Sequence, residues 1–158
     1  MSENPSVLVL GAGAIGAFYG AILNRAGCEV SVVLRSEYEA VNENGFEISS
    51  ELGDLSFRPA AVYRSAAECP TPPDYLVVGL KVVDGIDRVS AMRPAVGPDT
   101  TIVLIENGID IEPEIAEAFP DNRLISALAY VAVSRVAPGR VVHKAYGQLV
   151  FGNFPQGV

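Results

Sequence analysis

Residues 11 to 16 read Gly-Ala-Gly-Ala-Ile-Gly and form a G-x-G-x-x-G turn. An apolar run at 7–10 precedes the turn and a helical pattern over Ala14–Arg25 follows it, which is the context in which this motif binds a dinucleotide. We expect the first glycine to permit the tight turn, the second to leave room for a pyrophosphate, and the third to let helix and strand pack closely. The helix N-terminus supplies N–H groups and a partial positive charge for the phosphates. The predicted cofactor-binding segment is Gly11, Ala12, Gly13, Ala14, Ile15 and Gly16.

Arg35 stands directly after the second apolar run, residues 29–34. Dinucleotide sites that hold a free ribose 2′-hydroxyl usually carry an acid at this point, but no Asp or Glu lies between Val30 and Ser36. A guanidinium can pair with a 2′-phosphate and stack on the adenine, and Ser36 adds a hydroxyl donor. The pattern therefore favours NADP(H) over NAD(H) and FAD, with a solvated arginine at a strand end as the alternative.

Strand and helix patterns alternate along the rest of the first two thirds of the chain. A proline-rich loop at 65–74 follows a predicted hairpin, whose arms are FEISS (46–50) and LSFRPAAVY (55–63). Buried strands are predicted at 7–10, 29–34, 75–80 and 101–105, and helices at 14–25, 84–92 and 112–119, with a short helix at 36–44 capped by Ser36. This alternation is typical of an α/β protein with a parallel sheet.

The tail from residue 124 to 151 has a different pattern, with no helix long enough to cross between parallel strands. It contains three extended runs, 124–136, 140–146 and 147–152, which we expect to be joined by glycine turns in an antiparallel or mixed arrangement. The predicted fold is therefore a Rossmann-type, doubly wound, mostly parallel sheet with antiparallel strands at the C-terminal edge. Residues 1–158 are expected to form one domain.

Composition argues against several kinds of partner. The 158-residue chain has a net charge of −8 and no basic stripe, so a nucleic-acid partner is not expected. Cys28, Cys69 and His143 offer neither a disulfide framework nor metal-ligand spacing. The uncharged run at 7–23 is interrupted by four glycines and reads as a buried strand and helix rather than a membrane span or signal. We expect a cytoplasmic protein.

Together with these features, the chain resembles the ketopantoate reductase (2-dehydropantoate 2-reductase) family. The matching pieces are LGAGAIGAFYG, Arg35, GLK at 79–81, ENGID at 106–110 and RVAPGRVVHKAYGQLVFG in the tail, which together span nearly the whole chain. The resemblance implies that Leu80, Lys81 and Asn107 bind the cofactor NADPH. It places Lys81 and Asn107 near the nicotinamide, in supporting catalytic roles toward a 2-oxo acid. For Asn107, plain Asn-Gly turn chemistry is an equally weighted alternative.

Two residues qualify the resemblance. The family commonly reads Gln-Asn-Gly, and Glu106 takes the place of the glutamine. A carboxylate near the nicotinamide would repel an anionic substrate, so Glu106 either signals a different 2-oxo acid or faces away from the site. His143 matches a histidine of many family members, and we interpret it as a structural imidazole rather than a catalytic one.

The resemblance also implies a helical second domain that supplies the main acid lysine and the substrate-binding side chains, and we expect this chain to lack it. The first hypothesis is the NADPH-binding domain of an enzyme that reduces 2-dehydropantoate, inactive as the isolated chain. The alternatives are a stand-alone NADP-binding sensor or subunit, and a related reductase with another 2-oxo acid substrate. Homo-oligomerisation is left open.

Overall fold

The structure is a computed structural model that describes residues 3–81, 85–106 and 108–155. Its helices are α1 (Ala14–Arg25), α2 (Tyr38–Asn44), α3 (Arg88–Met92) and α4 (Glu112–Ala118), with 3-10 turns at Ala66–Glu68 and Arg93–Ala95. Its strands are β1 (Ser6–Leu10), β2 (Glu29–Val33), β3 (Phe46–Ser50), β4 (Leu55–Phe57), β5 (Val62–Tyr63), β6 (Tyr75–Val78), β7 (Thr101–Ile105), β8 (Leu124–Ala137) and β9 (Arg140–Phe154).

These strands join in one sheet with the order β4-β3-β9-β8-β7-β6-β1-β2-β5. The central strands β8, β7, β6, β1 and β2 are parallel to one another, and β5 extends them in parallel at one edge. Antiparallel pairing occurs between β8 and β9 and between β3 and β4, toward the other edge. The predicted fold class, a Rossmann-type and mostly parallel sheet with antiparallel strands at one edge, is confirmed.

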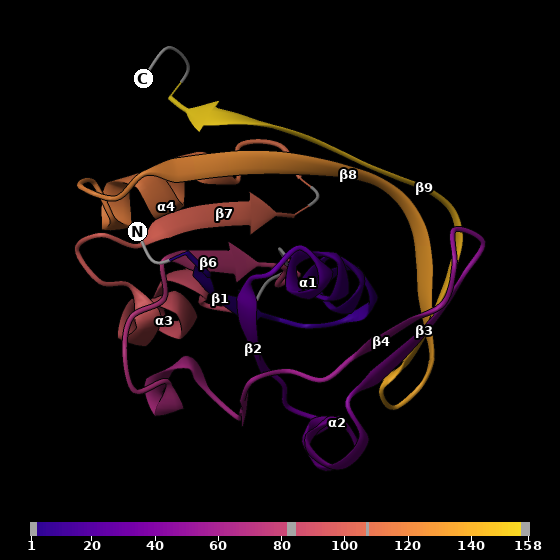
Figure 1. Cartoon of the computed structure of the whole chain (residues 1–158). Helices are drawn as coiled ribbons and strands as arrows, with labels where there is room; N and C mark the ends of the chain where they lie inside the picture. Colours follow the sequence, from indigo (N-terminus) through magenta and orange to yellow (C-terminus); the bar gives the residue numbers. More distant parts are fainter. Residues whose placement is uncertain (1–2, 82–84, 107, 156–158) are drawn as a thin grey trace.

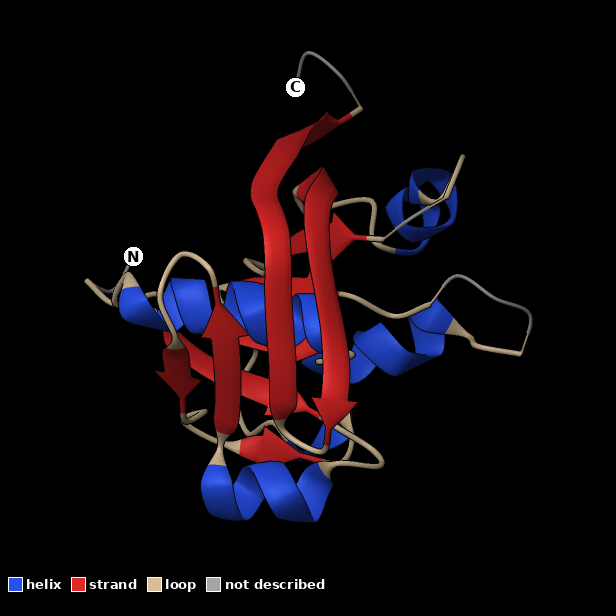
Figure 2. Ribbon diagram, turned by 90° about the vertical axis from the view of Figure 1, so that its right-hand side faces the viewer, coloured by secondary structure: helices blue, strands red, loops and turns tan. Residues whose placement is uncertain are grey.

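The sheet curls so that β8, β9 and the β3–β4 hairpin arch around helix α1 (Figure 1). Figure 2, turned by 90°, shows the long β8–β9 hairpin lying across α1. Six consecutive residues of α1, from Gly16 to Ala21, are buried, and a side chain on Gly20 would approach the Phe57 ring of β4 at 3.1 Å. A helix buried on all sides has no polar face, which explains why residues 7–23 carry no charge.

A second apolar cluster covers the other face of the sheet. There, α3, α4 and the two 3-10 turns pack against β1, β6 and β7, with Met92, Leu104 and Ile115 fully buried. The two clusters leave the carboxyl ends of the parallel strands uncovered, which is the edge where doubly wound sheets bind ligands.

The tail forms two long strands instead of three short ones. The predicted runs 140–146 and 147–152 are continuous in β9, and the β8–β9 register shifts where Tyr130 pairs with Gln148 and Val131 with Tyr146. Gly147 is therefore an extra residue in a β-bulge, with a positive φ of 147°. A bulge glycine has the same local signature as a turn glycine, but it bends the strand without ending it.

Three further expectations differ from the structure. The arm predicted at 55–63 is split: β4 pairs with β3, whereas β5 pairs with β2 at the opposite edge of the sheet. Helix α3 begins at Arg88, because Asp87 caps it by accepting a 3.0 Å bond from the N–H of Ser90; residue 84 lies outside the described residues. Helix α2 begins at Tyr38 with Glu37 as its N-cap, so Ser36 does not cap it.

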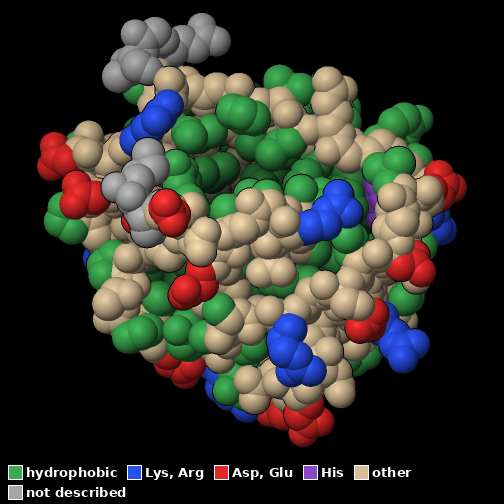
Figure 3. Space-filling model, viewed as in Figure 1, with side chains coloured by type: hydrophobic (Ala, Val, Ile, Leu, Met, Phe, Trp, Pro, Cys, Tyr) green, Lys and Arg blue, Asp and Glu red, His purple; other side chains and the backbone are tan. Residues whose placement is uncertain are grey.

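Across residues 3–81, 85–106 and 108–155, no helix is long and apolar enough to cross a membrane. Within the same ranges no group of three His, Cys, Asp or Glu residues is placed to hold a metal ion. Both cysteines are free thiols and partly buried. Figure 3 shows apolar side chains gathered in a hollow beneath the arch of β8.

Candidate nucleotide-binding site

The turn between β1 and α1 is packed against the end of β6. The N–H of Gly79 donates to the carbonyl oxygen of Leu10 at 2.9 Å, and Gly11 has a φ of +83° that disfavours other residues. A Cβ on Gly11 would lie 3.0 Å from the side chain of Leu80, and one on Gly16 would lie 3.0 Å from the Gly11 carbonyl oxygen. The two outer glycines therefore permit the close approach of strand, turn and helix.

Gly13, between them, has different surroundings. It is exposed, and a Cβ built on it would meet no heavy atom within 4 Å. It is also the N-cap of α1, where no side chain accepts from the first N–H groups of the helix. An open backbone surface at the start of a twelve-residue helix is suited to hold a phosphate group.

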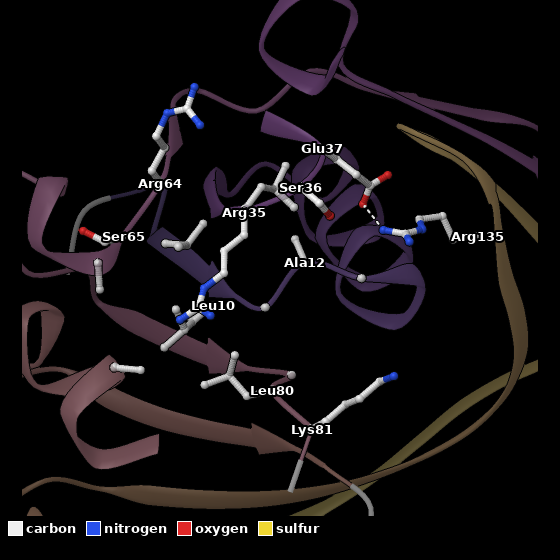
Figure 4. Close-up of a pocket in the computed structure, with 17 residues that line it drawn as sticks. Leu10, Ala12, Arg35, Ser36, Glu37, Arg64, Ser65, Leu80, Lys81 and Arg135 are labelled. Atoms are coloured by element: carbon white, nitrogen blue, oxygen red, sulfur yellow. Dashed lines mark ion pairs between the residues drawn. The ribbon is translucent and has the colours of Figure 1, made fainter. Parts of the chain in front are cut away.

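A cavity of about 330 Å³ opens beside this turn, between the carboxyl ends of β1, β2, β5 and β6 (Figure 4). Predicted site residues in its wall are Gly11, Ala12, Gly13, Arg35, Ser36, Leu80 and Lys81. Ala14, Ile15 and Gly16 form the first turn of α1 behind the cavity wall. Asn107 lies outside the described residues.

Three arginines line this cavity, and they differ in their partners. Arg64 pairs with Glu39 at 2.6 Å and lies 4.0 Å from the centre of the Tyr38 ring. Its hydrogen bond lowers the pKa of Glu39, so this pair stays charged. Arg135 pairs with Glu37 at 3.0 Å.

Arg35, by contrast, has no hydrogen bond or ion pair to any residue in the described part of the chain, and it is exposed. Its charge is therefore available to an anion in the cavity. The N–H of Leu34 donates to the Tyr63 carbonyl oxygen at 2.9 Å, which fixes the end of β2 beside β5 and brings Arg35 and Arg64 to the same cavity.

Lys81 follows the carboxyl end of β6 and is exposed. Figure 4 places it across the cavity from Arg64, on the side toward the β8–β9 arch. A dinucleotide extends over both halves of a doubly wound sheet. Arg64 and Lys81 therefore lie toward opposite ends of the candidate site.

Glu106 directly follows β7, and its side chain points into the protein. Its side chain is fully buried, and one oxygen, Oε1, accepts from Arg88 Nη1 at 3.0 Å. Arg88 is also buried and donates to the Ile111 carbonyl oxygen at 2.9 Å and to Glu114 at 2.7 Å. Among the described residues Glu106 Oε2 has no hydrogen-bond partner. Burial raises the pKa of Glu106 and outweighs the opposing effect of Arg88.

His143 is buried beneath the β8–β9 arch, away from the cavity. Its Nδ1 lies 2.7 Å from Ser50 Oγ, its Nε2 contacts the Tyr146 carbonyl oxygen, and its ring packs against Phe18 at 4.4 Å. Because a carbonyl only accepts, Nε2 carries a proton. This environment is the one expected of a structural imidazole.

Several residues of the cavity wall were not predicted from the sequence. Arg64 and Ser65 had a signal, since they directly follow the extended run predicted at 55–63 and so stand at a strand end. Glu37 and Arg135 had no such sequence signal, because their ion pair depends on how the β8–β9 hairpin curls back over the sheet.

The mostly parallel sheet, with the glycine turn at the carboxyl end of β1, defines a Rossmann-type α/β fold. Residues 7–156 match the family described as "Ketopantoate reductase PanE/ApbA". The chain belongs to the ketopantoate reductase family, and the predicted resemblance is confirmed.

The chain is similar to a 2-dehydropantoate 2-reductase from a Nostoc species, with 34% identity over 149 residues, covering 94% of this chain and 46% of the relative. The crystal structure of a 2-dehydropantoate 2-reductase from Methylococcus capsulatus shares 60% identity and a TM-score of 0.92, covering 97% of this chain and 50% of that one. A D-mandelate dehydrogenase solved with NADH and anilino(oxo)acetate shares the fold, with a TM-score of 0.84 at 20% identity over 96% of this chain and 49% of that one. The chain spans about half the length of these relatives.

Proposed function

We propose that this chain is the NADPH-binding domain of an oxidoreductase that reduces 2-dehydropantoate, a 2-oxo acid, to the 2-hydroxy acid. One observation carries the proposal. Arg35, which has no hydrogen bond or ion pair among the described residues, lines the same cavity as Gly13, whose backbone is exposed. The 2-dehydropantoate 2-reductases among its relatives support the choice of reaction.

In this proposal the start of α1 holds the pyrophosphate, and Gly13 lets it approach the backbone. Arg35 pairs with the 2′-phosphate and Ser36 donates a hydroxyl hydrogen bond to it. NADPH supplies the hydride. Lys81 and Asn107 are proposed to lie toward the nicotinamide, where a cation and an amide stabilise the negative charge that develops on the substrate oxygen.

The buried pair of Glu106 and Arg88 bears on the substrate. A carboxylate facing the nicotinamide would disfavour an anionic 2-oxo acid, but Glu106 is paired with Arg88 in the interior. Because Glu106 faces the interior, the replacement of the family's glutamine gives no reason to prefer a different 2-oxo acid over 2-dehydropantoate. The division into one nucleotide-binding domain, the cytoplasmic location and homo-oligomerisation stay predictions.

A titration of the purified chain with NADPH and NADH, followed by fluorescence, tests the proposal. We expect NADPH to bind more tightly, and Arg35→Ala to erase most of the preference, because a charge-assisted phosphate contact accounts for roughly tenfold or more in affinity. Arg140→Ala is the matched control, since it removes an exposed arginine outside the cavity. Equal affinities of the unmodified chain for the two cofactors would contradict the NADPH assignment.

A further inference from the structure

A buried carboxylate lies in the wall of the same cavity. Glu37 follows Arg35 by two positions, and its side chain is only 6% exposed. Dinucleotide sites that select a free ribose 2′-hydroxyl use an acid near this point, because a carboxylate accepts from the hydroxyl and repels a 2′-phosphate. Glu37 thus places an acid close to where the proposed cofactor needs a cation.

Both oxygens of Glu37 are held by the β8–β9 hairpin. Oε1 accepts from the backbone N–H of Gly139 at 2.8 Å, and Oε2 pairs with Arg135 Nη1 at 3.0 Å. Figure 4 shows this ion pair beside Ser36 at the edge of the cavity. Arg135 also lines the cavity, and its side chain is half exposed. The acid is therefore neutralised by a residue about a hundred positions away in the sequence.

We propose that Arg135 is a specificity-determining residue, which keeps Glu37 from selecting against the 2′-phosphate of NADPH. The inference rests on the proposed function. With Arg135 in place, the charge of Glu37 is neutralised, and the 2′-phosphate is attracted by the positive charge of Arg35. Without Arg135, Glu37 would retain one N–H partner and an uncompensated charge. A carboxylate so little hydrated would repel the phosphate across the cavity and offer an acceptor to a ribose hydroxyl.

Four variants of the full 158-residue chain test the inference by titration with NADPH and NADH: Arg135→Met, Glu37→Gln, the double variant of both, and Arg140→Met as control. We expect Arg135→Met to lower the preference for NADPH roughly tenfold, mainly through a weaker NADPH affinity. Glu37→Gln keeps an acceptor for Gly139 and should preserve or increase the preference. Arg140→Met makes the same charge change on the same hairpin and should leave the preference unaltered.

The double variant separates this role from direct contact between Arg135 and the phosphate. If Arg135 acts by neutralising Glu37, removing both charges restores a preference within about threefold of the unmodified chain. A double variant as impaired as Arg135→Met, or an Arg135→Met variant with unaltered preference, would overturn the inference. Thermal melting checks folding; if Arg135→Met does not fold, the double variant decides, and its loss of preference counts against the role. Failure of the unmodified chain to bind either cofactor would instead refute the proposed function.

Discussion

Gly13 and Gly16 lie three residues apart, yet a side chain would meet different surroundings at each. At Gly16 it would press on the Gly11 carbonyl oxygen and on Val9, within 3.1 Å of both. At Gly13 a Cβ would enter open space, and the φ of −71° lies outside the left-handed region that favours glycine. Close packing in the fold therefore explains why residue 16 is a glycine, but it does not explain the glycine at 13.

The variant Gly13→Val uses this difference. We expect a melting temperature close to that of the unmodified chain, because a Cβ at this position meets no heavy atom within 4 Å. We also expect loss of NADPH binding, because the side chain fills the space proposed for the pyrophosphate. Gly152→Val is a matched control, with equally open surroundings in β9 outside the nucleotide cavity. NADPH binding retained by a folded Gly13→Val variant would refute the role assigned to the turn.

Single residues were predictable from the sequence where the surrounding motif determines the backbone. The glycine turn and Arg35 are local signals, and Lys81 followed from the resemblance; all three reach the cavity wall. Glu37 and Arg135 meet across about a hundred residues, and no local pattern encodes that meeting. Glu106 was a recognised departure from the family, but the position of its partner Arg88 required the packing of α3 against β7 and α4.

The junction of β7, α3 and α4 depends on this partly satisfied charge network. Two carboxylates, Glu106 and Glu114, share the guanidinium of Arg88, and Glu106 Oε2 is left unpartnered among the described residues. The pKa of Glu106 is raised in the folded protein above its ordinary value of 4.5. Its protonated form thus favours the folded state, so the contribution of Glu106 to stability is fully present below pH 4.5 and is lost as the pH rises through the raised pKa.

Glu106→Gln should remove this loss. We expect the melting temperature of the variant, relative to the unmodified chain, to increase as the pH rises from 4.5 toward neutrality, because glutamine has no charge to bury. Melting curves across this range provide the measurement. Glu117→Gln, which changes an exposed carboxylate of α4, should show a nearly constant difference. A difference for Glu106→Gln that stays flat or declines with pH would contradict the raised pKa.

The elements follow closely from the hydrophobic pattern where neighbours in sequence are neighbours in the sheet. The strand at 101–105 and the helix that begins at Glu112 are found where they were predicted. The pattern failed where pairing is non-local: β5 leaves its predicted hairpin to extend β2, and β9 continues through its bulge because β8 pairs along its whole length. Hydrophobic periodicity indicates which residues of a strand are buried, but not which other strand pairs with it in the sheet.

On the scale of the whole chain, binding and catalysis make different demands. Binding a dinucleotide needs the cavity, the α1 N-terminus and Arg35, which lie together in this fold. Reduction of a ketone also needs a proton for its oxygen as the hydride arrives. The resemblance assigns the main acid lysine to a helical second domain, and the chain spans about half the length of its relatives. We propose that residues 1–158, taken by themselves, bind NADPH without efficient turnover.

Two measurements on the same sample test this expectation. NADPH at a hundred times its dissociation constant should stabilise the fold by about 2.7 kcal/mol and raise the melting temperature by roughly 5 to 10 °C, because it binds only the folded state. NADH at the same concentration should raise it less. With 2-dehydropantoate added, the absorbance of NADPH should decay little faster than in buffer. Rapid NADPH oxidation by the 158-residue chain would show that its own residues, with Lys81 the foremost candidate, protonate the substrate without a second domain.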